Sequence, residues 1–243
     1  FKQKTAYEIM PSLVGSEMCI RDRIMPVRKR YVIVLGREKG YRRYRLFKRF
    51  YTSNIEIRDL AKGWFMISLA FAIAFNGLNK GLAIAIPVAG LAVGTAFVFH
   101  ELSHKFMAQK YRYPAEFRSF DEMLFLALIM SFFGFVFAAP GAVMIQSYAV
   151  NKEKNGRIAA AGPMANLIMA ALFLIIFAVF IPQASGVMVG RWGLDVFLIK
   201  VNAFIAGFNL IPVWLFDGAK IFKWSKPVWF MMLGAALALM FLV

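Results

Sequence analysis

The chain has 243 residues, of which 60% are hydrophobic and only 17% charged, and its mean hydropathy is +0.63. These values exclude an ordinary soluble domain and favour a protein that crosses a membrane several times. The 29 basic residues outnumber the 13 acidic ones, which we interpret as basic loops facing anionic lipid headgroups; we expect no nucleic-acid partner. The single cysteine, Cys19, excludes both a disulfide framework and a thiolate metal site.

The first 60 residues differ from the rest of the chain. Residues 1–23 contain no apolar core of the kind that a signal peptide needs, and we interpret them as a non-native leader that resembles translated sequencing-adapter read-through. Residues 24–60 form a basic juxtamembrane segment with interleaved aromatic residues, a pattern expected at a membrane surface. The capping-box spacing of Ser53 and Glu56 predicts that a helix begins near Asn54.

Long apolar stretches recur through residues 61–243, the predicted membrane-embedded domain. They predict an all-α polytopic membrane protein with about five to six transmembrane helices. The expected helices cover residues 61–75, 82–109, 158–181, 194–216 and 227–243, with 123–139 as a further candidate.

The stretch 123–139 is ended by Pro140 and Gly141, and basic residues stand on both sides of the region around it. By the positive-inside rule both sides are cytoplasmic, as is the N-terminus. We therefore expect a small re-entrant or β element here rather than a single crossing, with residues 142–150 as a strand.

The only two histidines, His100 and His104, are four residues apart near the end of the second predicted helix, and Glu101 directly follows the first. One helical turn places both imidazoles on the same face, where they can bind a single metal ion. Ionisable side chains within an apolar helix are costly without a partner, which favours a metal site over a pair of core histidines. Glu101 is then the candidate general base.

A catalytic zinc ion takes three protein ligands and leaves one position for water. The carboxylates that could supply the third ligand are Glu116, Asp121, Glu122, Glu153, Asp195 and Asp217. The predicted topology favours Asp217, which lies at the end of a span on the cytoplasmic side, with the histidines. The simpler interpretation of Asp217 is a helix-end carboxylate that pairs with Lys220 or Lys223.

Three segments, at 100–104, 162–166 and 208–218, together resemble the signature of the site-2 protease family of intramembrane zinc metalloproteases, in an archaeal-like form. Their sequences are His-Glu-Leu-Ser-His, Gly-Pro-Met-Ala-Asn and Phe-Asn-Leu-Ile-Pro followed by Phe-Asp-Gly. The resemblance covers roughly residues 61–223. The chain departs from the family pattern at Ala219, where a second glycine is usual.

The resemblance implies that zinc is the cofactor and that His100, His104 and Asp217 bind it. It implies that Glu101 is the catalytic base. It also implies that two asparagines, near the reacting peptide, act as polar supports, namely Asn166 and Asn209.

The implied activity is hydrolysis of peptide bonds within or near transmembrane helices of membrane-protein substrates. An unwound substrate is expected to pair with an edge strand, for which residues 142–150 are the candidate. The alternative is a non-catalytic membrane scaffold or a metal transporter that uses the same His-His-Asp site. A zincin with a downstream glutamate ligand is disfavoured, because no glutamate follows Glu153.

Overall fold

The computed structural model describes residues 41–46, 50–136, 140–145, 150–181, 188–189, 192–213 and 216–241. The expected leader with Cys19 and much of the basic segment lie outside the described residues. The chain divides into a unit Phe1–Tyr41 and a unit Arg42–Val243, and the description below concerns the second. Its described residues are mostly helical, with three two-stranded sheets.

Strands β1 (Arg43–Arg45) and β2 (Tyr51–Ser53) pair antiparallel and lead directly into helix α4 (Asn54–Asn76). Ser53 caps this helix by accepting a hydrogen bond from the Glu56 N–H, which confirms the predicted helix start. The Glu56 carboxylate, in contrast, does not complete a reciprocal capping box. It contacts other elements, as described below.

Helix α5 (Leu82–Val93), the π-helix η1 (Gly94–Val98) and helix α6 (Phe99–Lys110) follow one another without a break. They confirm the long helix predicted over residues 82–109. Among the described residues, Leu82–Lys110 is one of two helices that are long and apolar enough to cross a membrane. A π-turn holds one more residue than an α-turn, so it rotates α6 by about 100° relative to α5.

Strand β3 (Ala115–Ser119), helix α7 (Asp121–Ser131) and strand β4 (Gly141–Ile145) form the connection from α6 to α8. β3 and β4 pair antiparallel, so the predicted small β element is present at this place. Helix α7 is about 16 Å long, too short to cross a bilayer, which agrees with the expectation that this region is not a single crossing. β4 matches the start of the expected strand 142–150, whose residues 146–149 lie outside the described part.

Helix α8 (Lys152–Ile175) continues as the π-helix η2 (Ile176–Phe180), and together they make the second helix that is long and apolar enough to cross a membrane. The helix begins earlier than the predicted residue 158, because the side chain of Asn151 caps it by accepting from the Lys154 N–H.

The remaining elements are the short strands β5 (Met188–Val189) and β6 (Trp192–Gly193) and three helices, α9 (Leu194–Asn209), α10 (Asp217–Trp224) and α11 (Lys226–Phe241).

The predicted helix 194–216 is too long, because α9 ends at Asn209, before Pro212. A new helix, α10, then starts at Asp217. Proline lacks a backbone N–H and disfavours helical geometry in the residue before it, which explains the break. Asp217 therefore opens a short helix of its own rather than closing a long span.

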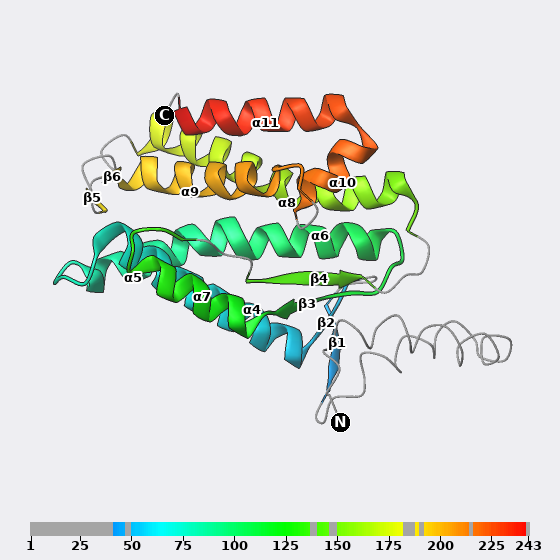
Figure 1. Ribbon diagram of the computed structural model, residues 1–243, viewed down its shortest axis with the longest axis horizontal. Coiled ribbons are helices and arrows are strands. Elements are labelled where there is room, and N and C mark those ends of the chain that lie inside the picture. The colour runs from blue at the N-terminus through cyan, green and yellow to red at the C-terminus, as the bar shows by residue number, and fades with distance from the viewer. Residues whose placement is uncertain are drawn as a thin grey trace, which may run out of the picture. The chain divides into compact units, whose positions relative to one another are not determined.

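Helix α6 lies between α8 on one side and the β3–β4 sheet on the other (Figure 1). On the sheet side Lys105 forms a buried ion pair with Glu56. The Glu56 carboxylate also accepts hydrogen bonds from the Thr52 hydroxyl at 2.7 Å and from the Phe117 N–H at 2.9 Å. The start of α4 and strand β3 are thereby fixed to the helix that carries both histidines.

Gln109, one turn after Lys105, adds a second attachment. Its amide accepts from the Tyr51 N–H and donates to the carbonyls of Tyr51 and Ala115, each at 3.0 Å. The side chain thus bridges β2 and β3 as a short length of backbone would. One face of α6, with Lys105 and Gln109, therefore contacts the strands and the start of α4. The face with His100 and His104 contacts α8 and α10 instead.

Candidate metal centre

Three side chains that could bind a metal ion converge between α6 and the start of α10. His100 and His104 extend from α6 and Asp217 from the first residue of α10, and their ligand atoms all lie within 4.8 Å of one another. The Nε2 atom of His104 is 2.8 Å from Asp217 Oδ2 and 3.0 Å from His100 Nε2, and His100 Nε2 is 3.5 Å from the same carboxylate oxygen. Two ligands of one tetrahedral zinc ion lie about 3.3 Å apart, so these donors fit zinc.

Helix α8 orients both imidazole rings. His100 Nδ1 lies 2.6 Å from the amide oxygen of Asn166, and His104 Nδ1 lies 2.7 Å from the carbonyl oxygen of Ile158. Because these oxygens can only accept, each Nδ1 carries the proton and each Nε2 keeps its lone pair. Both rings therefore present the nitrogen that a metal requires, as is usual when a ligating histidine is held from behind.

Gly162 of α8 passes directly in front of the two rings. A Cβ atom at this position would lie 2.3 Å from His104 Nε2 and 2.7 Å from His100 Nε2, distances that no real contact allows. In the sequence, Gly162 is the first residue of the Gly-Pro-Met-Ala-Asn segment, and no role in the metal site was predicted for it. Its spacing of four residues from Asn166, which puts both on one helix face, is the signal that could have identified it as part of the site.

Asp217 divides its two carboxylate oxygens between two roles. Oδ2 faces the histidines, and Oδ1 accepts a hydrogen bond from Lys220 at 3.1 Å. The ion pair and the metal-ligand position expected from the sequence are therefore both present. Gly218 makes this possible, because a Cβ there would lie 2.1 Å from the carbonyl oxygen of Leu210 and would push α10 away.

The other expected site residues differ in their surroundings. Glu101 is 9% exposed and lies in α6 directly after His100. Asn166 is fully buried, and its amide oxygen contacts His100. Asn209 is partly buried, and its amide donates to the Ile205 carbonyl in its own helix at 2.9 Å. Support of the reacting peptide by these two asparagines stays a prediction.

The remaining carboxylates do not join this group within the described part of the chain. Glu116 contacts Ser53 and Arg118, Asp121 pairs with Lys62, and Glu153 pairs with Arg157. Asp195 lies in the first turn of α9, at the opposite end of that helix from Asn209. Of the considered carboxylates, Asp217 alone completes the histidine pair.

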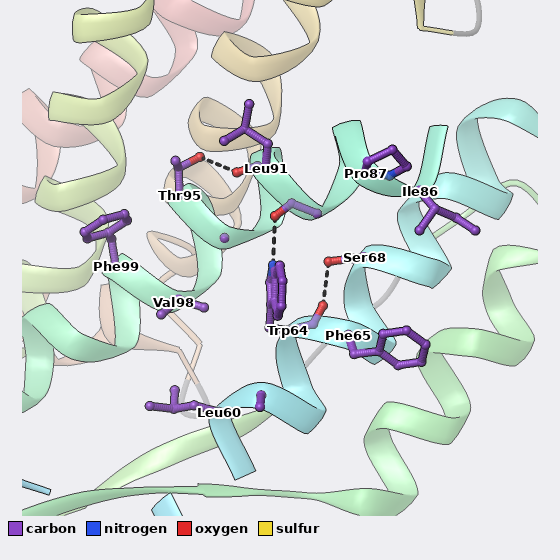
Figure 2. A pocket seen from close by; sticks show the side chains of 13 residues that line it. Leu60, Trp64, Phe65, Ser68, Ile86, Pro87, Leu91, Thr95, Val98 and Phe99 are labelled. Atoms are coloured by element: carbon purple, nitrogen blue, oxygen red, sulfur yellow. Dashed lines mark hydrogen bonds between the residues drawn. The ribbon is translucent and has the colours of Figure 1, made fainter. Parts of the chain in front are cut away.

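An apolar groove of about 700 Å³ lies between α4 and the continuous helix α5–η1–α6 (Figure 2). Trp64 stands in the groove and donates its indole N–H to the carbonyl oxygen of Gly90 at 2.8 Å. Phe99, the residue before His100, lines one end. The two histidines, Glu101 and Asp217 are not among the lining residues, so the groove is separate from the metal centre.

Comparisons with known proteins agree with this donor set. Residues 88–193 match the sequence profile of the family described as peptidase family M50. Over 181 residues the chain is 39% identical to a candidate zinc metalloprotease, MJ0611, of Methanocaldococcus jannaschii, and the match covers 74% of this chain and 90% of that protein. It is 28% identical over 159 residues to the zinc metalloprotease MJ0392 of the same organism, covering 65% of this chain and 40% of that protein. No solved structure matches the chain.

Proposed function

The chain belongs to peptidase family M50, the site-2 protease family, and from this premise we propose that it is an intramembrane zinc protease that cleaves peptide bonds within or near transmembrane helices of other membrane proteins. The observation that carries this function is the convergence of His100, His104 and Asp217 beside Glu101. Zinc is the cofactor of this metallopeptidase family, and the donor set fits it.

The chemistry is divided among four side chains. His100 and His104 would hold zinc through their Nε2 atoms and Asp217 through Oδ2. The ion would supply Lewis-acid activation of a water molecule and of the peptide carbonyl. Glu101 would accept a proton from the attacking water on a carboxylate oxygen and return it to the leaving amine as the peptide C–N bond breaks. Because Glu101 is buried beside His100, little bulk water competes for this proton.

The expected setting is a membrane, with several crossings. Support comes from the family and from the two long apolar helices, Leu82–Lys110 and Lys152–Phe180. The positive-inside rule favours a cytoplasmic N-terminus and an active site open to the cytoplasmic side. Basic side chains before α4, such as Arg43 and Arg45, would then lie near anionic headgroups.

Strand β4 offers an edge for an unwound substrate. The Phe117 N–H of β3 donates to Glu56 and therefore points away from β4. Val143, directly opposite, then belongs to a pair that exchanges no ladder hydrogen bonds, and its N–H and C=O also point outward. The same holds two residues along, at Ile145. Since the described sheet has two strands, this edge can accept a substrate segment by strand addition.

A proline at position 145 tests this pairing. Ile145→Pro removes one outward N–H without removing a ladder bond to β3, so cleavage is expected to fall at least about tenfold, the cost of one lost hydrogen bond. Zinc content should stay unchanged. Ile145→Ala keeps the N–H and serves as the matched control. Equal cleavage by the proline and alanine variants would contradict strand addition.

Zinc removal tests the function itself. The purified protein, reconstituted in liposomes with a panel of single-span transmembrane peptides, should produce fragments that mass spectrometry assigns to cuts within or near the span. Treatment with a zinc chelator should abolish fragment formation, and added zinc should restore it. If zinc-loaded protein cleaves none of the peptides, the scaffold or the transporter becomes the better explanation.

A further inference from the structure

Three polar side chains from three helices meet in the apolar interior next to the metal centre. Asn166 of α8 and Asn202 of α9 are fully buried, and Thr95 of the π-helix η1 is 8% exposed. Buried amides are costly unless each donor and acceptor has a partner. The hydrogen bonds of these three side chains connect them to one another, to His100 and to the backbone of η1.

The amide of Asn166 is fully engaged. Its Nδ2 donates to the Ala96 carbonyl at 2.6 Å and to Asn202 Oδ1 at 3.4 Å, and its Oδ1 accepts from His100 Nδ1 at 2.6 Å. With both protons on Nδ2 donated, only the oxygen is left to face His100. The orientation of this one amide thus decides the tautomer of the histidine.

Asn202 and Thr95 hold that amide from the far side. Asn202 Nδ2 donates to the Thr95 hydroxyl at 3.2 Å and to the Leu198 carbonyl at 3.0 Å. The single Thr95 hydroxyl proton is shared between the carbonyls of Ala92, at 2.9 Å, and Leu91, at 3.2 Å. Figure 2 shows the second of these bonds. Every amide proton and hydroxyl proton in the cluster therefore has an acceptor.

The cluster is attached to the π-turn, which decides where the histidines point. A π-turn interrupts the regular ladder of helical hydrogen bonds, and side chains commonly satisfy the carbonyls that it displaces. Here Asn166 donates to the carbonyl of Ala96 and Thr95 donates to carbonyls one turn earlier, so both stabilise η1. Loss of the π-turn would rotate His100 and His104 away from Asp217.

We propose that Asn202 and Thr95 are positioning residues of the metal centre. They act through Asn166 and the π-turn, and together they fix His100 with its proton on Nδ1 and its Nε2 directed at the zinc position. The inference rests on the proposed zinc site, which it deepens. Neither residue would touch the metal or the substrate.

Zinc affinity and ligand geometry test this role together. Asn202→Leu and Thr95→Val replace the polar groups by apolar ones on side chains of the same branched shape, and each should weaken zinc binding about 10- to 100-fold in competition with a chelator of known affinity. The visible absorption spectrum of the cobalt-loaded protein should change in both variants, because it reports the geometry of the ligands. Thr95→Ser retains the hydroxyl, so its zinc affinity and its cobalt spectrum should be those of the wild type.

Ser68→Ala is the matched control. Ser68 is 5% exposed and donates its hydroxyl to the Trp64 carbonyl within α4, without any link to His100, so its loss should leave zinc affinity and the cobalt spectrum unchanged. Wild-type affinity and spectrum in Asn202→Leu would overturn the proposal, as would equal losses in Ser68→Ala. Failure of zinc-loaded wild type to cleave peptides contradicts only the protease function.

Discussion

Replacement of Glu101 by glutamine is expected to lower the rate of peptide hydrolysis by about 10²- to 10⁴-fold, the usual contribution of a general base. Glutamine keeps the shape of the side chain but cannot take a proton from water. The zinc content should stay at that of the wild type, because the three donors at His100, His104 and Asp217 are unchanged. The measurements are the fragment yield from a reconstituted transmembrane peptide and the metal content of the same preparation.

Asp217→Asn provides the contrast for this experiment. The amide would replace a carboxylate oxygen that lies 2.8 Å from His104 Nε2, so zinc should be lost together with activity. The two variants thus separate a residue that moves protons from a residue that holds the metal. Cleavage at the wild-type rate by Glu101→Gln would require a different base and would contradict the assigned role.

Gly162→Ala is expected to weaken zinc binding by at least about 100-fold, at the upper end of the effects known for changes to residues that surround metal ligands. The added methyl group would lie 2.3 Å from His104 Nε2 and 2.7 Å from His100 Nε2, so one ring or the helix must move. Alanine favours helix more than glycine does, so α8 itself should not be weakened. Chelator competition measures the affinity, and thermal unfolding in detergent shows whether the fold is kept.

Gly207→Ala is the matched control for this substitution. Gly207 lies within α9, and a Cβ there would be 3.8 Å from the Cβ of Ala236, which is an ordinary contact. Zinc affinity should therefore not change. Wild-type zinc affinity in Gly162→Ala would mean that α8 can move away from the histidines without weakening zinc binding. The short distance between Gly162 and the two rings would then not be required for the site.

Features that depend on residues close together in the sequence could be predicted from the sequence alone. The helix over residues 82–109 and its pair of histidines on one face arise from periodicity, and the start of α4 arises from the Ser53 cap. A metal site followed from the spacing of His100 and His104, and zinc as its metal followed from the resemblance to the site-2 protease family. These are short-range patterns, which the local geometry of a helix converts directly into structure.

Tertiary structure alone decided the features that depend on residues far apart in the chain. Strand β3 was not predicted from the sequence, and it is held by pairing with β4 and by the Glu56 carboxylate. The predicted helix 194–216 failed because apolar composition continues past Asn209 while Pro212 interrupts the helical ladder.

The metal centre shows the same division between local pattern and long-range packing. The sequence favoured Asp217 from topology, but the close approach at Gly218 is what brings its carboxylate to the histidines. Gly162 belongs to a segment that resembles the family signature, but that resemblance assigned it no role. Asn202 and Thr95 gave no such signal, because a lone polar residue in an apolar helix has many ordinary uses. Their importance arises from the distances between α6, α8 and α9, and those distances exist only after the helices pack.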